Sequence, residues 1–226
     1  IVRLNLPSYL TDFQRAGGDT AYVYARGLRT HRISYRELAE LAWRTARWLR
    51  GAHGLAAGDR VILWGLNSGE WAAAFWGCLA AGVVAVPVDA QASAAYVARI
   101  AEDTQAGLLM HGDENAARGD GRLRCLRFES LSETVAGCPA LPPAMDGITR
   151  ETLAQIIYTS GSTASPKGVC LTHGNTLASL EPLEREIARY RRWERPFHPL
   201  RFLVQLPLSH VFGQMLGLFI PPLLRG

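Results

Sequence analysis

The sequence lacks any apolar run long enough to cross a membrane. The nearest approach, residues 216–224, is nine residues long and contains two prolines, whereas a membrane-spanning helix needs about 20 apolar residues. Charge is also sparse, because charged residues make up 19% of the 226 residues and the formal net charge is +4. An excess this small gives no reason to expect a nucleic-acid partner.

Cysteine is scarce, and its spacing excludes the common metal sites. The four cysteines form no Cys-x-x-Cys pair and no zinc pattern with histidine. We therefore assign no metal ligand, and this cysteine usage favours a reducing, cytoplasmic setting. Cys78 and Cys170 lie in apolar or β-like stretches, which predicts that both are small core residues.

The remaining composition is that of a globular protein, with 48% hydrophobic residues, 22 glycines and 12 prolines. The chain starts at Ile1 without an initiator methionine or a signal-peptide pattern, and it stops at Gly226 directly after an apolar stretch. We interpret it as a piece of a longer protein.

Strand and helix patterns alternate along residues 1–128, which we take as a first α/β region. Short connections in this order predict a mostly parallel sheet flanked by helices, an α/β fold. The expected strands cover residues 20–25, 32–35, 60–65, 83–88 and 107–110, and the expected helices begin near Ser34, Asn67 and Ser93.

A connection rich in proline and glycine follows at residues 129–150. Residues 151–226 then start a second α/β region. Its expected elements are strands at 153–158, 168–172 and 201–205, a helix at 174–192 and a loop at 206–213.

The loop after residue 158 has the composition of a phosphate site. Five hydroxyl side chains fall within residues 159–165, and Gly161 lets the backbone approach a ligand closely. Lys167 is the only lysine of the chain, and its compact ammonium group suits a polyphosphate. A Walker loop needs four residues between its glycines followed by Lys-Ser/Thr, and the spacing here argues against it. A plain polar surface loop remains the alternative.

This loop resembles the phosphate-loop signature of the AMP-forming adenylating enzymes. That family includes acyl-CoA synthetases, fatty acyl-AMP ligases, luciferases and peptide-synthetase adenylation domains. Its usual form is Tyr-Thr-Ser-Gly-(Ser/Thr)-Thr-Gly-x-Pro-Lys-Gly-Val, which residues 158–169 match except at Ala164 and the variable position. Further segments resemble the family's motifs in the same order, at residues 58–71, 81–88, 171–175 and 206–213.

The resemblance implies a reaction, its cofactors and two groups of site residues. A carboxylate attacks the α-phosphate of ATP to give an acyl-adenylate and pyrophosphate, and a thiol, commonly coenzyme A, then takes the acyl group. ATP, Mg²⁺ and coenzyme A are therefore implied, and the chain resembles the N-terminal part of the family's large domain. The implied phosphate-binding residues are Thr159, Ser160, Gly161, Ser162, Thr163, Lys167 and Gly168, and the implied acyl-site residues are His210, Phe212 and Gly213.

The motif around His210 and the apolar run after it are most similar to long-chain fatty acyl-CoA ligases, which implies a fatty-acid substrate. Two alternatives stay open: a fatty acyl-AMP ligase that loads a carrier protein, and a truncated, non-catalytic nucleotide- or acyl-binding relative. The family's adenine and ribose motifs, its Mg²⁺-binding glutamate and its C-terminal lysine are not in these 226 residues. We therefore assign no catalytic residue and expect this piece alone not to exchange pyrophosphate into ATP.

A basic cluster lies between Arg185 and Arg201, with six arginines and two glutamates. It is either a solvated helix face or a contact for an anionic membrane surface or a ligand phosphate. The sequence thus predicts a cytoplasmic protein, with peripheral membrane contact as a hypothesis. We expect a structural role for His173 near a helix start, and assign none to His31, His53, His111 and His198.

Overall fold

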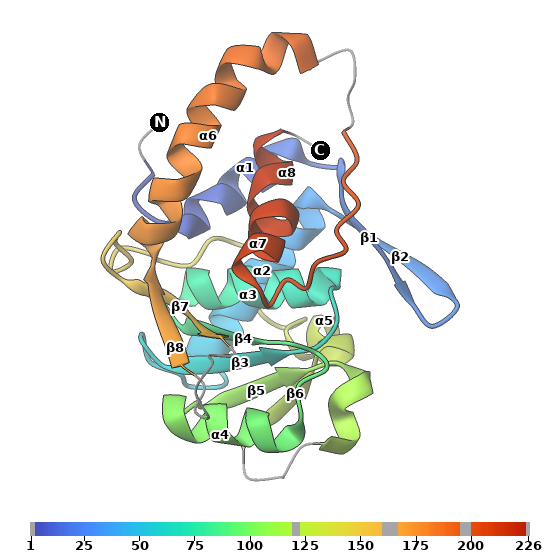
Figure 1. Cartoon of the computed structure of the whole chain (residues 1–226), viewed down its shortest axis with the longest axis vertical. Coiled ribbons are helices and arrows are strands. Elements are labelled where there is room, and N and C mark those ends of the chain that lie inside the picture. Colours follow the sequence, from blue (N-terminus) through green and yellow to red (C-terminus); the bar gives the residue numbers. More distant parts are fainter. Residues whose placement is uncertain (1–2, 119–122, 160–166, 195–199, 225–226) are drawn as a thin grey trace.

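The computed structural model describes residues 3–118, 123–159, 167–194 and 200–224. Their centre is a six-stranded sheet in the order β6-β5-β3-β4-β7-β8 (Figure 1). All neighbouring strands are parallel except β7 and β8, which are antiparallel. The mostly parallel α/β sheet expected from the sequence is confirmed. Its strands are β3 (Arg60–Trp64), β4 (Val84–Val88), β5 (Leu108–His111), β6 (Cys125–Arg127), β7 (Leu153–Thr159) and β8 (Lys167–Thr172).

Helices cover both faces of this sheet. Side chains alternate between the faces of a strand, and accordingly Val61 and Leu63 of β3 pack in one core cluster while Ile62 and Trp64 pack in another. The first cluster contains α2 (Tyr35–Arg50) and α3 (Gly69–Ala81), and the second contains residues of α4 (Ala94–Thr104). Because both faces are covered, the central strands read as unbroken apolar runs.

The helices are capped by the residues that the sequence predicts, with one exception. Ser34 and Glu37 form the expected capping box, and the backbone N–H of Ser34 lowers the pKa of the Glu37 carboxyl by donating to it. The expected cap of α3 by Asn67 is wrong, because the Ser68 hydroxyl accepts from the backbone N–H of Trp71 at 3.0 Å. The Asn67 side chain is therefore free for another contact.

The N-terminal elements precede the sheet. Strands β1 (Thr20–Arg26) and β2 (Arg29–Ser34) form the expected antiparallel hairpin, with its turn at Gly27, which has a φ of +56°. Figure 1 shows the hairpin projecting to one side of the molecule. The short helices before and between the strands are η1 (Leu6–Ser8), α1 (Tyr9–Ala16), η2 (Asp113–Arg118), η3 (Phe128–Ser130) and α5 (Leu131–Thr134).

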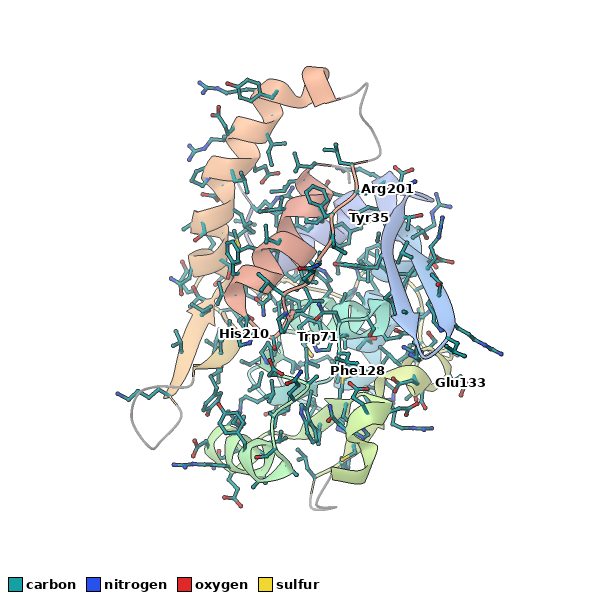
Figure 2. The ribbon with its side chains drawn as sticks, turned by 45° about the vertical axis from the view of Figure 1, so that its right-hand side comes forward. Tyr35, Trp71, Phe128, Glu133, Arg201 and His210 are labelled. Carbon is teal, nitrogen blue, oxygen red and sulfur yellow. The ribbon has the colours of Figure 1, made fainter. Side chains whose placement is uncertain are left out.

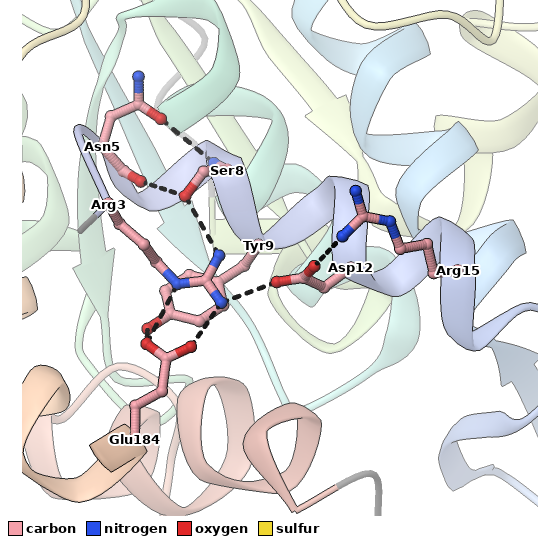
Figure 3. Close-up of polar contacts among 7 residues, drawn as sticks. All are labelled: Arg3, Asn5, Ser8, Tyr9, Asp12, Arg15 and Glu184. Atoms are coloured by element: carbon pink, nitrogen blue, oxygen red, sulfur yellow. Dashed lines mark hydrogen bonds and ion pairs between the residues drawn. The ribbon is translucent and has the colours of Figure 1, made fainter. Parts of the chain in front are cut away.

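A buried guanidinium joins the N-terminal segment to the long helix α6 (His173–Glu194) (Figure 3). Arg3 donates to Glu184 at 2.7 Å and to Asp12 at 2.7 Å, and it stacks 3.7 Å from the centre of the Tyr9 ring. Burial opposes the charge, but the hydrogen bonds to Glu184 and Asp12 outweigh it and raise the pKa of Arg3 above its ordinary value.

The last described segment departs from the sequence-based expectation. Residues 201–205 form no strand in the structure, although their apolar pattern predicts one. Leu203 is 84% exposed, and no strand within the described ranges pairs with this segment. The chain then forms a continuous helical stretch, composed of α7 (Val211–Gln214), the π-helix η5 (Met215–Phe219) and α8 (Ile220–Leu223).

The prediction for the two core cysteines is half right. Cys78 is buried in α3, and burial raises the pKa of its thiol to about 12. Cys170 is exposed, because β8 lies at an edge of the sheet formed by the described residues. The division at residues 129–150 stays a prediction, and β7 and β8 join the same sheet as the earlier strands.

No helix in the described part of the chain has the length and apolar character needed to span a membrane.

Candidate functional site

Three adjacent parallel strands end at one edge of the sheet. In the order β3-β4-β7, each strand runs in the same direction, so their carboxyl ends lie side by side. Ala85 of β4 pairs with Gln155 of β7, which places Asp89 level with Thr159 along the two strands. In open α/β sheets, ligands bind at this carboxyl edge. The loops that leave these three strands are therefore the candidate site.

The predicted phosphate loop begins at this edge. Its ends are opposite each other in the antiparallel pair of β7 and β8, where Thr159 pairs with Lys167 and Tyr158 pairs with Gly168. A Cβ atom at Gly168 would lie 2.9 Å from the side chain of Ile156, so glycine suits this close pairing. Of the predicted phosphate-binding residues, Ser160, Gly161, Ser162 and Thr163 lie outside the described residues.

The segment with the predicted acyl-site residues crosses the same edge, and Asn67 holds its first part. Asn67 follows β3, and its side-chain oxygen accepts from the backbone N–H of Leu208 at 2.8 Å. Its amide group donates to the carbonyl of Leu206 at 2.9 Å. One side chain thus fixes both sides of Pro207 against the loop that leaves β3.

A buried pair of glutamines holds the second part of this segment. Gln155 of β7 and Gln214 of α7 exchange two side-chain hydrogen bonds, at 3.0 Å and 2.9 Å. Both residues are 1% exposed. Because a buried amide is costly without partners, the reciprocal pair fixes α7 to the strand that leads into the phosphate loop.

His210 lies between these two anchors, directly before α7. Figure 2 shows it at the end of the helical stretch nearest the sheet. Its Nε2 atom is 3.3 Å from Oδ2 of Asp89, the residue that follows β4. The structure therefore brings His210 to the edge where Thr159 and Lys167 begin and end the phosphate loop.

Gly213 and Phe212 serve this arrangement differently. A Cβ atom at Gly213 would lie 2.0 Å from the carbonyl oxygen of Pro207, so only glycine lets α7 approach the preceding loop this closely. Phe212 is 64% exposed. Leu66, Leu206 and Val211, in the loop after β3 and in the His210 segment, are exposed as well.

His173 lies apart from this site and has a structural role. It is 1% exposed, and its Nδ1 atom accepts from the backbone N–H of Leu6 at 3.2 Å. Burial lowers the pKa of His173 to about 4, so the imidazole is neutral at physiological pH.

The sequence patterns predicted no role for Asp89, Gln155 or Gln214. They predicted that Asn67 caps α3, whereas its side chain contacts Leu206 and Leu208. Gln155 left a signal, because it is the one amide in an otherwise apolar strand. Asp89 left a weaker signal as the first charged residue after the apolar run of β4. Their partners come from distant parts of the chain, which spacing in the sequence cannot reveal.

Comparison with known proteins gives a family match and several relatives. The family model described as AMP-binding enzyme matches residues 11–226. A feruloyl-CoA synthase of Amycolatopsis sp is 33% identical over 201 residues, covering 86% of this chain and 38% of that protein. The long-chain-fatty-acid–CoA ligase FadD13 of Mycobacterium tuberculosis is 32% identical over 191 residues, covering 80% and 36%. Syringomycin synthase SyrB1 of Pseudomonas syringae is 35% identical over 156 residues, covering 68% and 24%.

Solved structures agree with this match. The inhibitor-bound N-terminal domain of FACL13 from Mycobacterium tuberculosis superposes with a TM-score of 0.75 at 27% identity, covering 99% of this chain and 56% of that one. A nonribosomal peptide synthetase, FmoA3, in its α-methyl-L-serine-AMP-bound form, gives a TM-score of 0.78 at 25% identity, covering 99% and 23%. The chain thus spans 23% to 56% of the lengths of these relatives and solved structures.

Proposed function

Because the chain belongs to the AMP-binding enzyme family, we propose that it is the N-terminal portion of an ATP-dependent acyl-CoA synthetase. In this proposal the full-length protein activates a fatty acid as an acyl-adenylate and transfers it to coenzyme A. The relatives named above also include a feruloyl-CoA synthase and a syringomycin synthase. The family supports an adenylate-forming ligase, and the fatty-acid substrate is the finer part of the proposal.

One observation carries the proposal: the phosphate loop and the His210 segment share the carboxyl edge of β3, β4 and β7. Asn67, which follows β3, and Gln155 of β7 hold that segment at this edge. An acid bound beside His210 is therefore placed next to nucleotide phosphates bound by the loop. Joining a carboxylate to a phosphate requires this proximity.

The loop's part in the reaction is to hold phosphate groups. Thr159, Ser160, Gly161, Ser162, Thr163 and Gly168 would supply hydroxyl and backbone donors, and Lys167 would supply a positive charge. Lys167 is exposed and pairs opposite Thr159 at the base of the loop, which leaves its ammonium group accessible to a nucleotide. Donors fixed in advance stabilise charge as it develops on the phosphates.

Magnesium and coenzyme A enter the proposal from the family. Among the residues that the structure describes, no group of three carboxylate, histidine or cysteine side chains could hold a metal ion. No step of the proposal depends on a magnesium site among these residues. Coenzyme A is the proposed acceptor, and a carrier protein is the alternative.

The acid is proposed to be a long-chain fatty acid. Phe212, Val211 and Leu206 offer exposed apolar surface around His210, and the relatives include the fatty-acid ligase FadD13. Apolar side chains bind an acyl chain by removing its surface from water. His210, Phe212 and Gly213 would thus form one side of the acyl site.

Peripheral membrane contact from the cytoplasm extends this proposal. Arg185, Arg189 and Tyr190 are exposed on α6, and a basic surface of this kind is attracted to anionic lipid. Vesicle sedimentation with and without an anionic phospholipid tests it. We expect binding that rises with anionic lipid content, and binding independent of it would contradict contact through this basic surface.

The function is tested by ATP-dependent hydroxamate formation, in which hydroxylamine traps the activated acyl group. The full-length protein is assayed with a panel of fatty acids of increasing length, a hydroxycinnamic acid and several amino acids. We expect product with the long-chain fatty acids above the other classes. Preference for an amino acid or an aromatic acid would contradict the substrate, and the absence of product with every acid would contradict the ligase.

A further inference from the structure

The contact between Asp89 and His210 assigns a role to a residue that the proposed function does not use. We propose that Asp89 is a positioning residue: its carboxylate orients the His210 ring and selects the protonation of Nε2. The proposal rests on the proposed function only in placing His210 at the acyl site.

The Asp89 carboxylate is itself oriented by the turn after β4. Its Oδ1 atom accepts from the backbone N–H of Gln91 at 2.8 Å, and its carbonyl accepts from the N–H of Ala92 at 2.9 Å. This is the local geometry of an aspartate turn. Because Oδ1 is occupied by the turn, Oδ2 is the oxygen directed to Nε2 of His210.

The backbone of His210 is equally well held. Its N–H donates to the carbonyl of Pro207 at 3.1 Å, and its carbonyl accepts from the N–H of Gln214 at 2.9 Å. With both backbones fixed, the torsions of the imidazole side chain are the main remaining freedom. The hydrogen bond to Asp89 restricts that freedom, as supporting hydrogen bonds do at preorganised sites.

The contact also determines which ring nitrogen carries the proton. An ionised carboxylate can only accept, so Nε2 must be the donor. In the neutral ring, Nδ1 is then left without a proton and can accept a hydrogen bond. His210 and Asp89 are 57% and 38% exposed, and exposed pairs contribute little to stability. The contact therefore acts on the orientation of the ring and hardly on the fold.

Two variants and a matched control test this role in the full-length protein. Asp89→Ala removes the acceptor. Asp89→Asn keeps the turn through its single side-chain oxygen and presents an NH2 donor to Nε2 in place of Oδ2. Asp146→Ala is the control, because Asp146 is exposed and lies in the connection between β6 and β7. The ring is observed by ¹⁵N NMR without substrate, and the KM values for acid and ATP are measured separately.

We expect neutral His210 to carry its proton on Nε2 in the natural protein and in the control. In Asp89→Asn we expect the proton on Nδ1, because the NH2 group that faces Nε2 can only donate. In Asp89→Ala we expect a mixture of both tautomers and a KM for the acid raised about fivefold, with an unchanged KM for ATP. The KM effect should disappear in the His210→Ala background.

An unchanged tautomer in Asp89→Ala, or a KM effect that persists in the His210→Ala background, would overturn the proposal. If no acid is activated, the proposed function fails, while the tautomer result still decides the role of Asp89.

Discussion

At the scale of single residues, burial separates two histidines that both lie at the start of a helix. His173 is 1% exposed and bonded to the backbone of Leu6, whereas His210 is half exposed and contacts a carboxylate at the edge of the sheet. A buried neutral imidazole stabilises the fold only while it stays neutral. The first histidine therefore affects acid stability, and the second is available to a ligand.

Replacing His173 by asparagine tests this difference through the pH dependence of unfolding. The folded pKa of His173 is about 4, below the ordinary 6.5, so between these values the unfolded state binds the proton and the folded state does not. Stability is complete above the ordinary pKa and falls by about 2 kcal/mol from pH 7 to pH 5. His173→Asn keeps an acceptor for Leu6 but cannot titrate. Urea unfolding should show a smaller pH-dependent loss in this variant, and equal losses in both proteins would refute the role of His173.

Gly213 provides a second prediction at this scale. Gly213→Ala places a methyl group against the carbonyl of Pro207 and forces α7 away from the preceding loop. We expect a loss of about 1–3 kcal/mol in the free energy of unfolding. Gly147→Ala is the control, because nothing lies within 4 Å of a Cβ atom there and the backbone needs no positive φ. Similar unfolding curves for the two variants would contradict the close approach.

At the scale of elements, two glutamates in the middle of α6 make charged contacts of different depth. Glu184 binds the guanidinium of Arg3, which is 7% exposed, whereas Glu186 pairs with the exposed Arg189 one turn along the same helix. Removing one partner of a buried charge is costly, because the other charge is left in a poorly solvated place. An exposed pair in water contributes little.

Two leucine substitutions on α6 separate these cases. Glu184→Leu leaves Arg3 with Asp12 as its remaining acidic partner and should lower the free energy of unfolding by about 1–3 kcal/mol. Glu186→Leu should change it by less than about 0.5 kcal/mol. Denaturant unfolding measures both, and a similar effect of the two substitutions would show that Arg3 does not anchor the helix.

The elements also show where sequence patterns succeed and fail. The capping box at Ser34 and the apolar runs of β3 and β4 predicted their elements, because local hydrogen bonds and two covered faces determine both. The strand expected at residues 201–205 is absent, because a strand needs a partner that an apolar pattern alone does not supply. Cys170 was predicted to be a core residue for a similar reason. The apolar pattern of β8 does not reveal that the strand lies at an edge of the sheet, where Cys170 is exposed.

At the scale of the whole molecule, the motifs predicted the candidate site, and tertiary contacts bring its segments together. The residues near Lys167 and His210 were found from the sequence, because each motif is a short continuous segment. The contacts that join them, from Asn67, Asp89 and Gln155, connect positions 59 to 141 residues apart. Such contacts exist only after the parallel strands have placed their carboxyl ends side by side.

The central claim is that the loop ending at Lys167 binds the phosphates of ATP beside the segment that carries His210. The most direct measurement is acid-dependent exchange of labelled pyrophosphate into ATP by the full-length protein and its Lys167→Ala variant. Arg189→Ala serves as the matched control, because it removes an exposed positive charge from α6. We predict that Lys167→Ala lowers the exchange rate at least tenfold, as losing about 1.4 kcal/mol of transition-state stabilisation would, while Arg189→Ala exchanges at the rate of the natural protein. Equal exchange by the natural protein and Lys167→Ala would contradict the claim.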